Sequence, residues 1–245
     1  MLKEAIEKLI EIAGPEGICI NDKHFLISKD GNSVTEIKPE FEFPRTLNLF
    51  SLEALIAMVT TEASETYNTP FYINVCGHDE VICYTQPLEK LRNERAVLYY
   101  VKVKDVPGWS MKVELPFVEA LIAIRTQFQQ TPDAEYLLRI LSDISNSAKV
   151  TFSDNGMASS VVTKKGIDLQ ANELIRPIVS LKPYRTFQEV DQPSSEFHIR
   201  ISERDIKFIE ADGGMWMLTA RRTIAEYLSQ KLSGLIDAGT VIVTI

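Results

Sequence analysis

The sequence predicts an α+β fold in which antiparallel strands form hairpins and the helices occur in clusters. Strand-like and helix-like segments follow one another without the strict alternation that a doubly wound parallel sheet requires. Short turn sequences also join consecutive strand segments, and Asn155-Gly156 is the strongest of them. We expect residues 1–245 to form a single cooperative domain or two closely packed lobes. The break would fall near residues 104–114, where Val106-Pro107-Gly108 interrupts the pattern.

The composition is that of a globular protein, with 245 residues, 45% hydrophobic and 24% charged. A net charge of -8 argues against a protein that coats duplex DNA through clustered lysines and arginines. The chain has three cysteines, an odd number that cannot all pair with one another, and its first residues lack the pattern of a secretory leader. We therefore expect free thiols in a reducing cytoplasm. No apolar segment approaches the roughly 20 residues that span a bilayer, so we expect no membrane contact.

Residues 1–64 predict two helices on either side of a hairpin. Six apolar residues at helical spacing predict a helix over residues 2–13, which Gly14-Pro15 ends. Residues 24–28 and 33–37 have strand patterns and flank a turn sequence, so they predict a β-hairpin. A second helix is expected over residues 51–64, with Ser51 as its N-cap.

The middle of the chain predicts strands followed by two helices. Adjacent antiparallel strands are expected at residues 71–75, 81–84 and 96–103, which are rich in β-branched and aromatic residues. Apolar residues at helical spacing from Phe117 to Phe128 predict the first helix. The second helix begins after Thr131, an N-cap residue, with Pro132 at its first position.

The chain from residue 148 onward is again rich in strand patterns. Strands are expected at residues 148–152, 159–163, 177–187, 195–202, 205–210 and 240–245. The first two flank Asn155-Gly156 and therefore predict a hairpin. A last helix is expected over residues 219–233.

Three residues of the types that bind zinc lie close together in the sequence: Cys76, His78 and Cys83. In a symmetric hairpin Cys76 and Cys83 would face each other, and Cys19 with His24 could complete the site. The chain has no Cys-x-x-Cys pair, however, and thiols on strands more often behave as small hydrophobic groups. We therefore expect no metal and no other cofactor.

The sequence contains none of the common motifs for nucleophilic catalysis or phosphate binding, such as G-x-S-x-G or G-x-x-x-x-G-K-[ST]. Asp154, Glu189, Glu210 and Asp212 stand near predicted strand ends or turns, where carboxylates commonly hold a metal ion. They support the alternative of a metal-dependent enzyme. Acidic residues at turns are more often turn formers, so we expect no catalytic residue.

Basic residues on a predicted strand and a predicted helix are better candidates for binding. Strand alternation puts His198 and Arg200 on the face opposite the core, where they could bind an anion or simply face solvent. Arg221 and Arg222 are expected in the first turn of the last helix, where the helix dipole disfavours cations. They could recruit an anion, or Arg222 could pair with Glu226. The predicted binding set is Arg185, His198, Arg200, Arg221 and Arg222.

Part of the chain resembles a known family. The segments Pro183–Phe187, Gln192–Ser195 and Phe208–Trp216, with the helix that follows, resemble the C-terminal half of YfdQ-like phage and prophage proteins. Phe43-Pro44-Arg45 and residues 152–156 fit the same layout. That family is catalogued as a domain of unknown function. The resemblance implies a phage protein whose relatives often lie among early genes, near recombination and nucleotide-metabolism functions, and it supplies no catalytic residues.

The expected function is therefore that of a non-enzymatic binding protein in the cytoplasm of a bacterial host cell, working as a homo-oligomer. The preferred partner is a phage or host protein, in DNA replication, recombination or host defence, because an acidic chain suits protein partners better than nucleic acid. Single-stranded nucleic acid is the alternative ligand. The alternative functions are a metal-dependent enzyme acting on nucleotides or nucleic acid, and a self-assembling structural phage protein.

Overall fold

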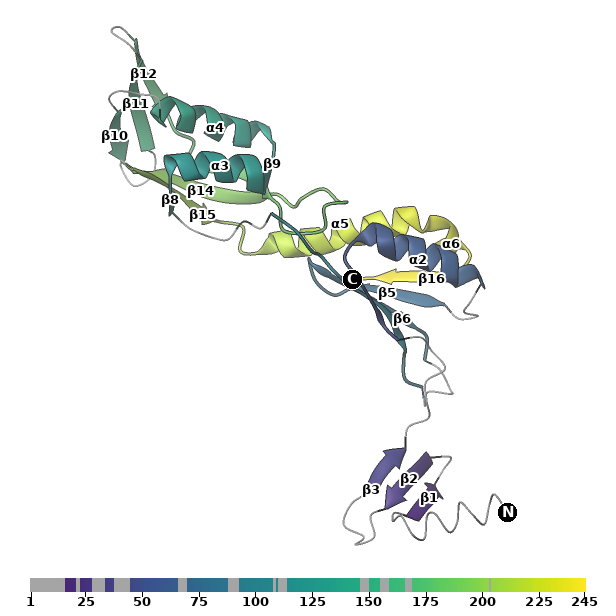
Figure 1. Ribbon diagram of the computed structural model, residues 1–245. Helices are drawn as coiled ribbons and strands as arrows, with labels where there is room; N and C mark the ends of the chain where they lie inside the picture. The colour runs from purple at the N-terminus through teal and green to yellow at the C-terminus, as the bar shows by residue number, and fades with distance from the viewer. Residues whose placement is uncertain are drawn as a thin grey trace. The chain divides into compact units, whose positions relative to one another are not determined.

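The computed structural model (Figure 1) has an α+β fold with mostly antiparallel sheets, as predicted. It describes residues 16–20, 23–27, 34–37, 45–65, 70–87, 93–107, 109, 114–145, 150–154, 159–165, 169–202 and 204–245. The chain divides into two compact units: Met1–Pro44 with Leu88–Glu94, and Arg45–Pro87 with Arg95–Ile245. None of the described helices is both long and apolar enough to cross a membrane.

The first unit contains a three-stranded antiparallel sheet in the order β1-β2-β3. Its strands are β1 (Glu16–Ile20), β2 (Lys23–Ile27) and β3 (Val34–Ile37). Ile27 pairs with Val34, which confirms the hairpin predicted from the turn sequence between them. The sequence did not predict β1. The helix expected over residues 2–13 lies outside the described residues.

The second unit contains two five-stranded sheets. The one that we call the first sheet has the strand order β16-β5-β6-β7-β4. Its strands are β4 (Leu47–Leu49), β5 (Phe71–Val75), β6 (Glu80–Thr85), β7 (Val97–Lys102) and β16 (Val241–Thr244). The antiparallel order of β5, β6 and β7 and the terminal strand β16 are confirmed. The two edge strands pair in parallel, β4 with β7 and β16 with β5. Parallel pairing requires a long connection between the two strands, and both connections include helices.

Helices cover one face of the first sheet (Figure 1). They are α2 (Leu52–Glu65), α5 (Met215–Lys231) and the short α6 (Ser233–Asp237). Ser51 Oγ accepts a hydrogen bond from the Ala54 amide at 3.1 Å, which confirms the predicted N-cap of α2. Leu52, Leu55 and Val59 are fully buried at helical spacing, so α2 presents its apolar stripe to the core.

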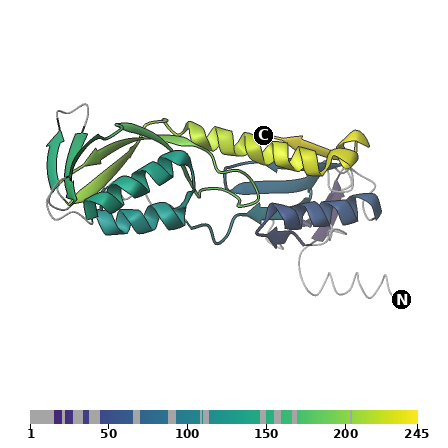
Figure 2. The same cartoon turned by 90° about the horizontal axis from the view of Figure 1, so that it is seen from above.

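The second sheet also has five strands, in the order β8-β15-β14-β13-β9. They are β8 (Glu114–Pro116), β9 (Phe128–Gln129), β13 (Ile178–Pro183), β14 (Ser195–Ile201) and β15 (Asp205–Glu210). The chain passes from the first sheet to the second between Lys102 and Glu114. Helices α3 (Phe117–Gln127) and α4 (Pro132–Ser145) pack side by side on one face of it (Figure 2).

Both helices on the second sheet follow the predicted pattern, with one exception. The Thr131 hydroxyl accepts a hydrogen bond from the Ala134 amide at 3.2 Å, as predicted for the start of α4. Phe128 was expected on the helical face of α3, which was wrong, because its backbone is extended and begins β9. Its ring is nevertheless buried and packs edge-on against Trp109 at 4.7 Å.

A third small sheet, β10-β11-β12, follows α4. It consists of β10 (Val150–Asp154), β11 (Ser159–Lys165) and β12 (Leu169–Leu174). Asp154 pairs with Ser159, which confirms the hairpin predicted around Asn155-Gly156. The turn residues themselves lie outside the described part of the chain, and β12 was not predicted.

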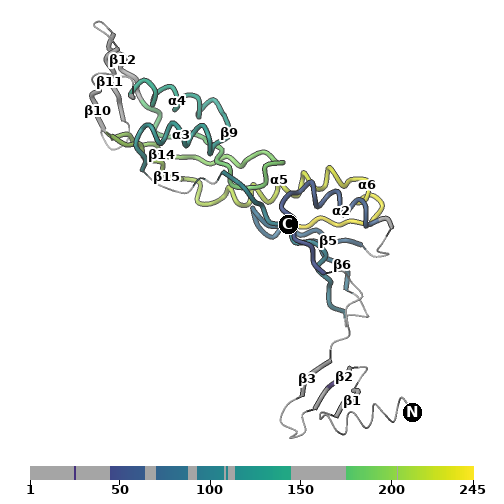
Figure 3. The backbone as a smooth tube through the Cα atoms, viewed as in Figure 1, coloured from purple at the N-terminus to yellow at the C-terminus, as the bar shows by residue number. Residues whose placement is uncertain are grey.

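The loop between β13 and β14 departs most from the prediction (Figure 3). A strand was expected to run to Phe187, but β13 ends at Pro183, which has no amide hydrogen to extend a ladder. The Gln192 side chain closes the loop instead. Its amide oxygen accepts from the Arg185 and Thr186 amides at 2.9 and 3.3 Å, and its NH₂ group donates to the Phe187 and Val190 carbonyls at 3.0 and 3.3 Å.

Candidate functional site

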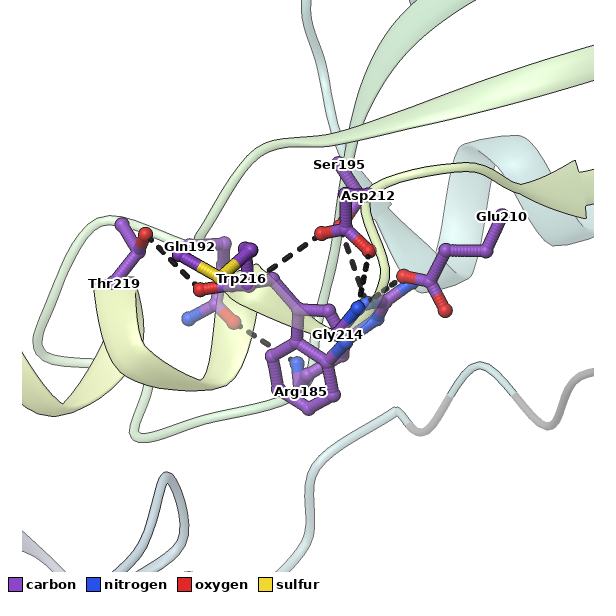
Figure 4. Close-up of polar contacts among 9 residues, drawn as sticks. Arg185, Gln192, Ser195, Glu210, Asp212, Gly214, Trp216 and Thr219 are labelled. Atoms are coloured by element: carbon purple, nitrogen blue, oxygen red, sulfur yellow. Dashed lines mark hydrogen bonds and ion pairs between the residues drawn. The ribbon is translucent and has the colours of Figure 1, made fainter.

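A polar cluster lies where the β13–β14 loop, the end of β15 and the start of α5 meet (Figure 4). We call Arg185, Ser195, Glu210, Asp212 and Trp216 the Arg185 node. Arg185 Nη1 donates to Glu210 Oε1 at 2.5 Å and to Ser195 Oγ at 3.3 Å. The two side chains of this ion pair are only 7% and 13% exposed, so the pair is an interior feature.

Asp212 joins the node to the start of α5. Its carboxylate accepts hydrogen bonds from Ser195 Oγ at 2.9 Å, from the Gly214 amide at 3.0 Å and from the Trp216 amide at 3.2 Å. Gly213 and Gly214 adopt φ angles of 64° and 82°, the left-handed region in which glycine is preferred. Asp212 and the two glycines therefore form the turn that starts the helix. The Asp212 side chain accepts hydrogen bonds from amides that have no partner within the helix.

Aromatic rings surround the Arg185 guanidinium. Its carbon lies 4.5 Å from the centroid of the Trp216 ring and 5.7 Å from that of Phe197. The His78 ring meets Trp216 edge-on at 4.8 Å, which brings the β5–β6 turn to the node. Arg185 Nη2 is buried and has no hydrogen-bond partner, a cost that the cation–π contact with Trp216 partly offsets.

The bonds within the node limit its chemistry. Glu210 neutralises Arg185, and the Asp212 carboxylate already accepts three hydrogen bonds. The Ser195 hydroxyl donates to Asp212 and accepts from the Arg185 guanidinium, so both its proton and its oxygen are already engaged within the node. The node is thus a preformed set of internal bonds that holds β14, β15 and α5 together.

Of the predicted binding set, only Arg185 lies in the node. His198 and Arg200 are exposed on the face of β14 that points away from α3 and α4, and burial alternates along the strand as predicted. In the strand register His198 lies between Ile178 on β13 and Ile209 on β15. Arg200 lies directly opposite Lys207.

Arg221 and Arg222 are not in the first turn of the helix, so this prediction was wrong. The helix begins at Met215 rather than at residue 219, because the turn at Asp212 starts it earlier. Arg221 Nε donates to the Val75 carbonyl at 3.1 Å and so ties α5 to the end of β5. Arg222 is exposed, and its pairing with Glu226 stays a prediction.

The four candidate carboxylates are distributed over different places. Glu210 and Asp212 belong to the node, whereas Glu189 Oε1 accepts a hydrogen bond from the Leu52 amide at 2.7 Å and caps α2. The side chain of Asp154 lies outside the described residues. Within the described residues, no group of three or more His, Cys, Asp or Glu side chains is placed to hold a metal ion.

The symmetric hairpin expected for the two cysteines was wrong. Cys83 pairs with Ile73, while Cys76 lies beyond the last pair of the ladder. The reason is that the turn is centred on His78 and not between Asp79 and Glu80, and the Cys76 and Gly77 amides both donate to the Glu80 carbonyl at 3.1 Å. Cys76 is exposed, whereas Cys83 is fully buried and burial raises its pKa to about 12.

Gln192, Trp216 and His78 were missed as parts of this site. No local pattern distinguishes a glutamine that closes a loop from one that faces solvent, because its four partners are defined only after folding. His78 reaches the node because the Thr186 hydroxyl donates to its carbonyl across 108 positions of sequence. Only tertiary contact could reveal these roles.

Comparisons with known proteins do not assign the chain to a family. No protein-family model, no curated protein and no solved structure matches the chain. The resemblance to YfdQ-like phage proteins, and the phage origin that it implies, therefore stay predictions.

Proposed function

We propose that the protein is a non-enzymatic binding protein that docks another protein on the outward face of the second sheet. One observation carries this proposal: a row of exposed side chains crosses three neighbouring strands of that face. Ile178 and Ile209, on either side of His198, are 45% and 36% exposed. Large apolar side chains that gather on an open face, with polar groups around them, are typical of protein-binding surfaces.

Charge defines the kind of partner. Arg200 and Lys207 lie directly opposite each other on β14 and β15, an arrangement that costs about 0.2–1 kcal/mol when nothing neutralises it. Glu114 lies opposite Lys207 on the other side and balances one of the two cations. Glu196, two residues before His198 on the same exposed side of β14, adds a second carboxylate, so the face carries both signs of charge. It suits a partner surface that combines complementary charges with apolar side chains.

The Arg185 node supports this assignment as a scaffold. Ser195 is the first residue of β14 and Glu210 is the last residue of β15, the two strands that carry His198, Arg200 and Ile209. By binding both through one guanidinium, Arg185 fixes the ends of these strands. A binding face on a rigid sheet loses little conformational entropy when a partner docks.

The biological setting that we propose comes from the family resemblance. A phage early protein in the cytoplasm of a bacterial host would find its partner among replication, recombination or host-defence proteins. A homo-oligomer would present several copies of the face and strengthen weak binding.

The test is affinity capture of the tagged full chain from cells in which it is naturally produced, with co-purifying proteins and nucleic acid identified. Ile209→Glu should release a protein that the unmodified chain retains, because it places an acidic group in the apolar row. Ile122→Glu, at a residue of α3 that is 58% exposed, is the matched control and should retain that protein. Identical captures from both variants would contradict the proposal.

A further inference from the structure

The open face of the first sheet is rich in tyrosine. Residues alternate along β5 and β6, so that Phe71, Ile73 and Val75 are fully buried on the side of α2 and α5. Tyr72 and Tyr84 occupy the opposite side, where they are partly exposed. A solvated sheet face normally carries mainly polar side chains, so aromatic rings at these positions require a reason.

The two rings form an ordered pair. Tyr72 and Tyr84 lie directly opposite each other in the strand register, with ring centroids 5.9 Å apart and planes within 2° of parallel. The Arg95 guanidinium carbon lies 4.7 Å from the Tyr72 centroid and 5.3 Å from the Tyr84 centroid. Because the two distances are similar, the guanidinium contacts both rings and not just one of them.

The position of Arg95 is built into the backbone. Its Nη1 donates to the Thr85 carbonyl at 3.0 Å, and the buried Thr85 hydroxyl accepts from the Ala96 amide at 3.1 Å. The β6–β7 register shifts between Cys83 and Tyr84, an irregularity of the kind that re-aims side chains. The cation and both rings are thus positioned before any ligand arrives.

Neighbouring strands extend this face. Tyr100 lies opposite Ile82, and Ile242, 39% exposed, lies opposite Tyr72. Lys102 lies opposite Glu80, and a hydrogen bond to the Glu80 carboxylate raises the pKa of Tyr100. We call Tyr72, Tyr84, Tyr100 and Arg95 the tyrosine face.

We propose that the tyrosine face binds single-stranded nucleic acid by stacking of its bases. Unpaired bases stack on tyrosine rings and on guanidinium planes, and the tyrosine face offers both on one open sheet. Such stacking tolerates any base sequence, because every base has a π-face. A duplex keeps its bases covered and should bind poorly. This site is independent of the proposed function, since it uses the other sheet and another class of ligand.

The charges of the face predict an unusual salt dependence. Among the described residues, Arg95 and Lys102 are the cations of this face, and Glu80 and Asp79 oppose them. Two phosphate contacts give a slope of about -1.4 in log K against log salt for a single strand, far less than a basic groove would give. Most of the affinity should therefore come from stacking and survive moderate salt.

The experiment uses the full chain and a fluorescein-labelled oligothymidylate of about 12 nucleotides, within the length range of known single-strand sites. Binding is followed by fluorescence anisotropy at several salt concentrations, with a duplex of equal length for comparison. We expect Tyr72→Leu and Tyr84→Leu each to weaken binding about tenfold, whereas Tyr72→Phe keeps the ring and should retain the affinity. Arg95→Gln should weaken binding and make the salt slope shallower.

The matched control is Tyr227→Leu on α5, the helix that covers the other face of the first sheet. It should leave the affinity unchanged, and circular dichroism should show every variant folded. The proposal is overturned by no binding of the single strand, by equal or tighter binding of the duplex, or by unchanged affinity in both leucine variants. A captured protein that is lost with Tyr72→Leu, in the absence of oligonucleotide binding, would assign the face to a protein instead.

Discussion

Arg185 is the residue on which the polar contacts of the node converge, and its value to the fold should be measurable. Arg185→Met leaves Glu210, only 13% exposed, without its cation, so we expect the free energy of unfolding to fall by about 3–5 kcal/mol. The double variant Arg185→Met/Glu210→Met removes both charges and should recover part of the loss. Urea denaturation measures both values, and a double variant that loses the sum of the single effects would contradict the role of the ion pair.

Gln192 is a second residue with a testable structural role. Gln192→Met keeps a similar volume but removes four hydrogen bonds, and it leaves the Arg185 and Thr186 amides without their acceptor. We expect the free energy of unfolding to fall by about 2–4 kcal/mol, because unsatisfied buried groups are costly. The exposed Gln230 on α5, replaced by Met, is the control and should change stability by less than about 0.5 kcal/mol.

Cys83 predicts a change of stability at alkaline pH. Burial raises the pKa of its thiol from 9.0 to about 12, so the folded state holds the proton more tightly than the unfolded chain. The stabilisation that comes from this difference in the pKa of Cys83 is therefore fully present below pH 9.0 and is lost as the pH rises toward about 12. Cys83→Ala should show a weaker decline over this range in denaturation experiments. An identical decline in both proteins would show that other groups cause it.

At the scale of elements, the start of α5 depends on one side chain. Asp212→Ala removes the acceptor for the Gly214 and Trp216 amides, so we expect a loss of about 1 kcal/mol, within the range measured for helix caps. Asp212→Asn keeps an acceptor oxygen and should lose less. Thermal unfolding of the two variants tests this, and equal losses would show that the charge of Asp212 matters more than its hydrogen bonds.

Elements with strong local signals were predicted well from the sequence. The helices α2 and α4 were found from their caps and apolar spacing, and the hairpins from their turn residues. The start of α5 was placed four residues late, because Asp212 acts as a cap through a turn of two glycines that carries no apolar pattern. The end of β13 was placed too late, because the β13–β14 loop is held by the Gln192 side chain and not by a local turn.

At the scale of the whole molecule, we expect the protein to self-associate into a closed oligomer. The second unit leaves large apolar side chains exposed on several surfaces, among them Phe50 at 55% and Met215 at 61%. Light scattering coupled to gel filtration measures the mass. A stable monomer at every concentration would contradict this expectation, and a large ring or shell would favour the alternative of a structural phage protein.

The sequence by itself determined the α+β class, the helices α2 to α5, most strands and the alternation that exposes His198 and Arg200, because these depend on local periodicity and turn chemistry. Only the tertiary structure decided that Arg185 binds Glu210 and Trp216, that Arg221 binds the Val75 carbonyl, and that Arg95 lies against two tyrosine rings. These contacts join residues distant in sequence, and an arginine that faces solvent has the same local pattern as one that closes a buried node. The fold therefore separates the predicted basic set into the interior Arg185, Arg221 as a tie between elements, His198 and Arg200 on an open face, and the exposed Arg222 on α5.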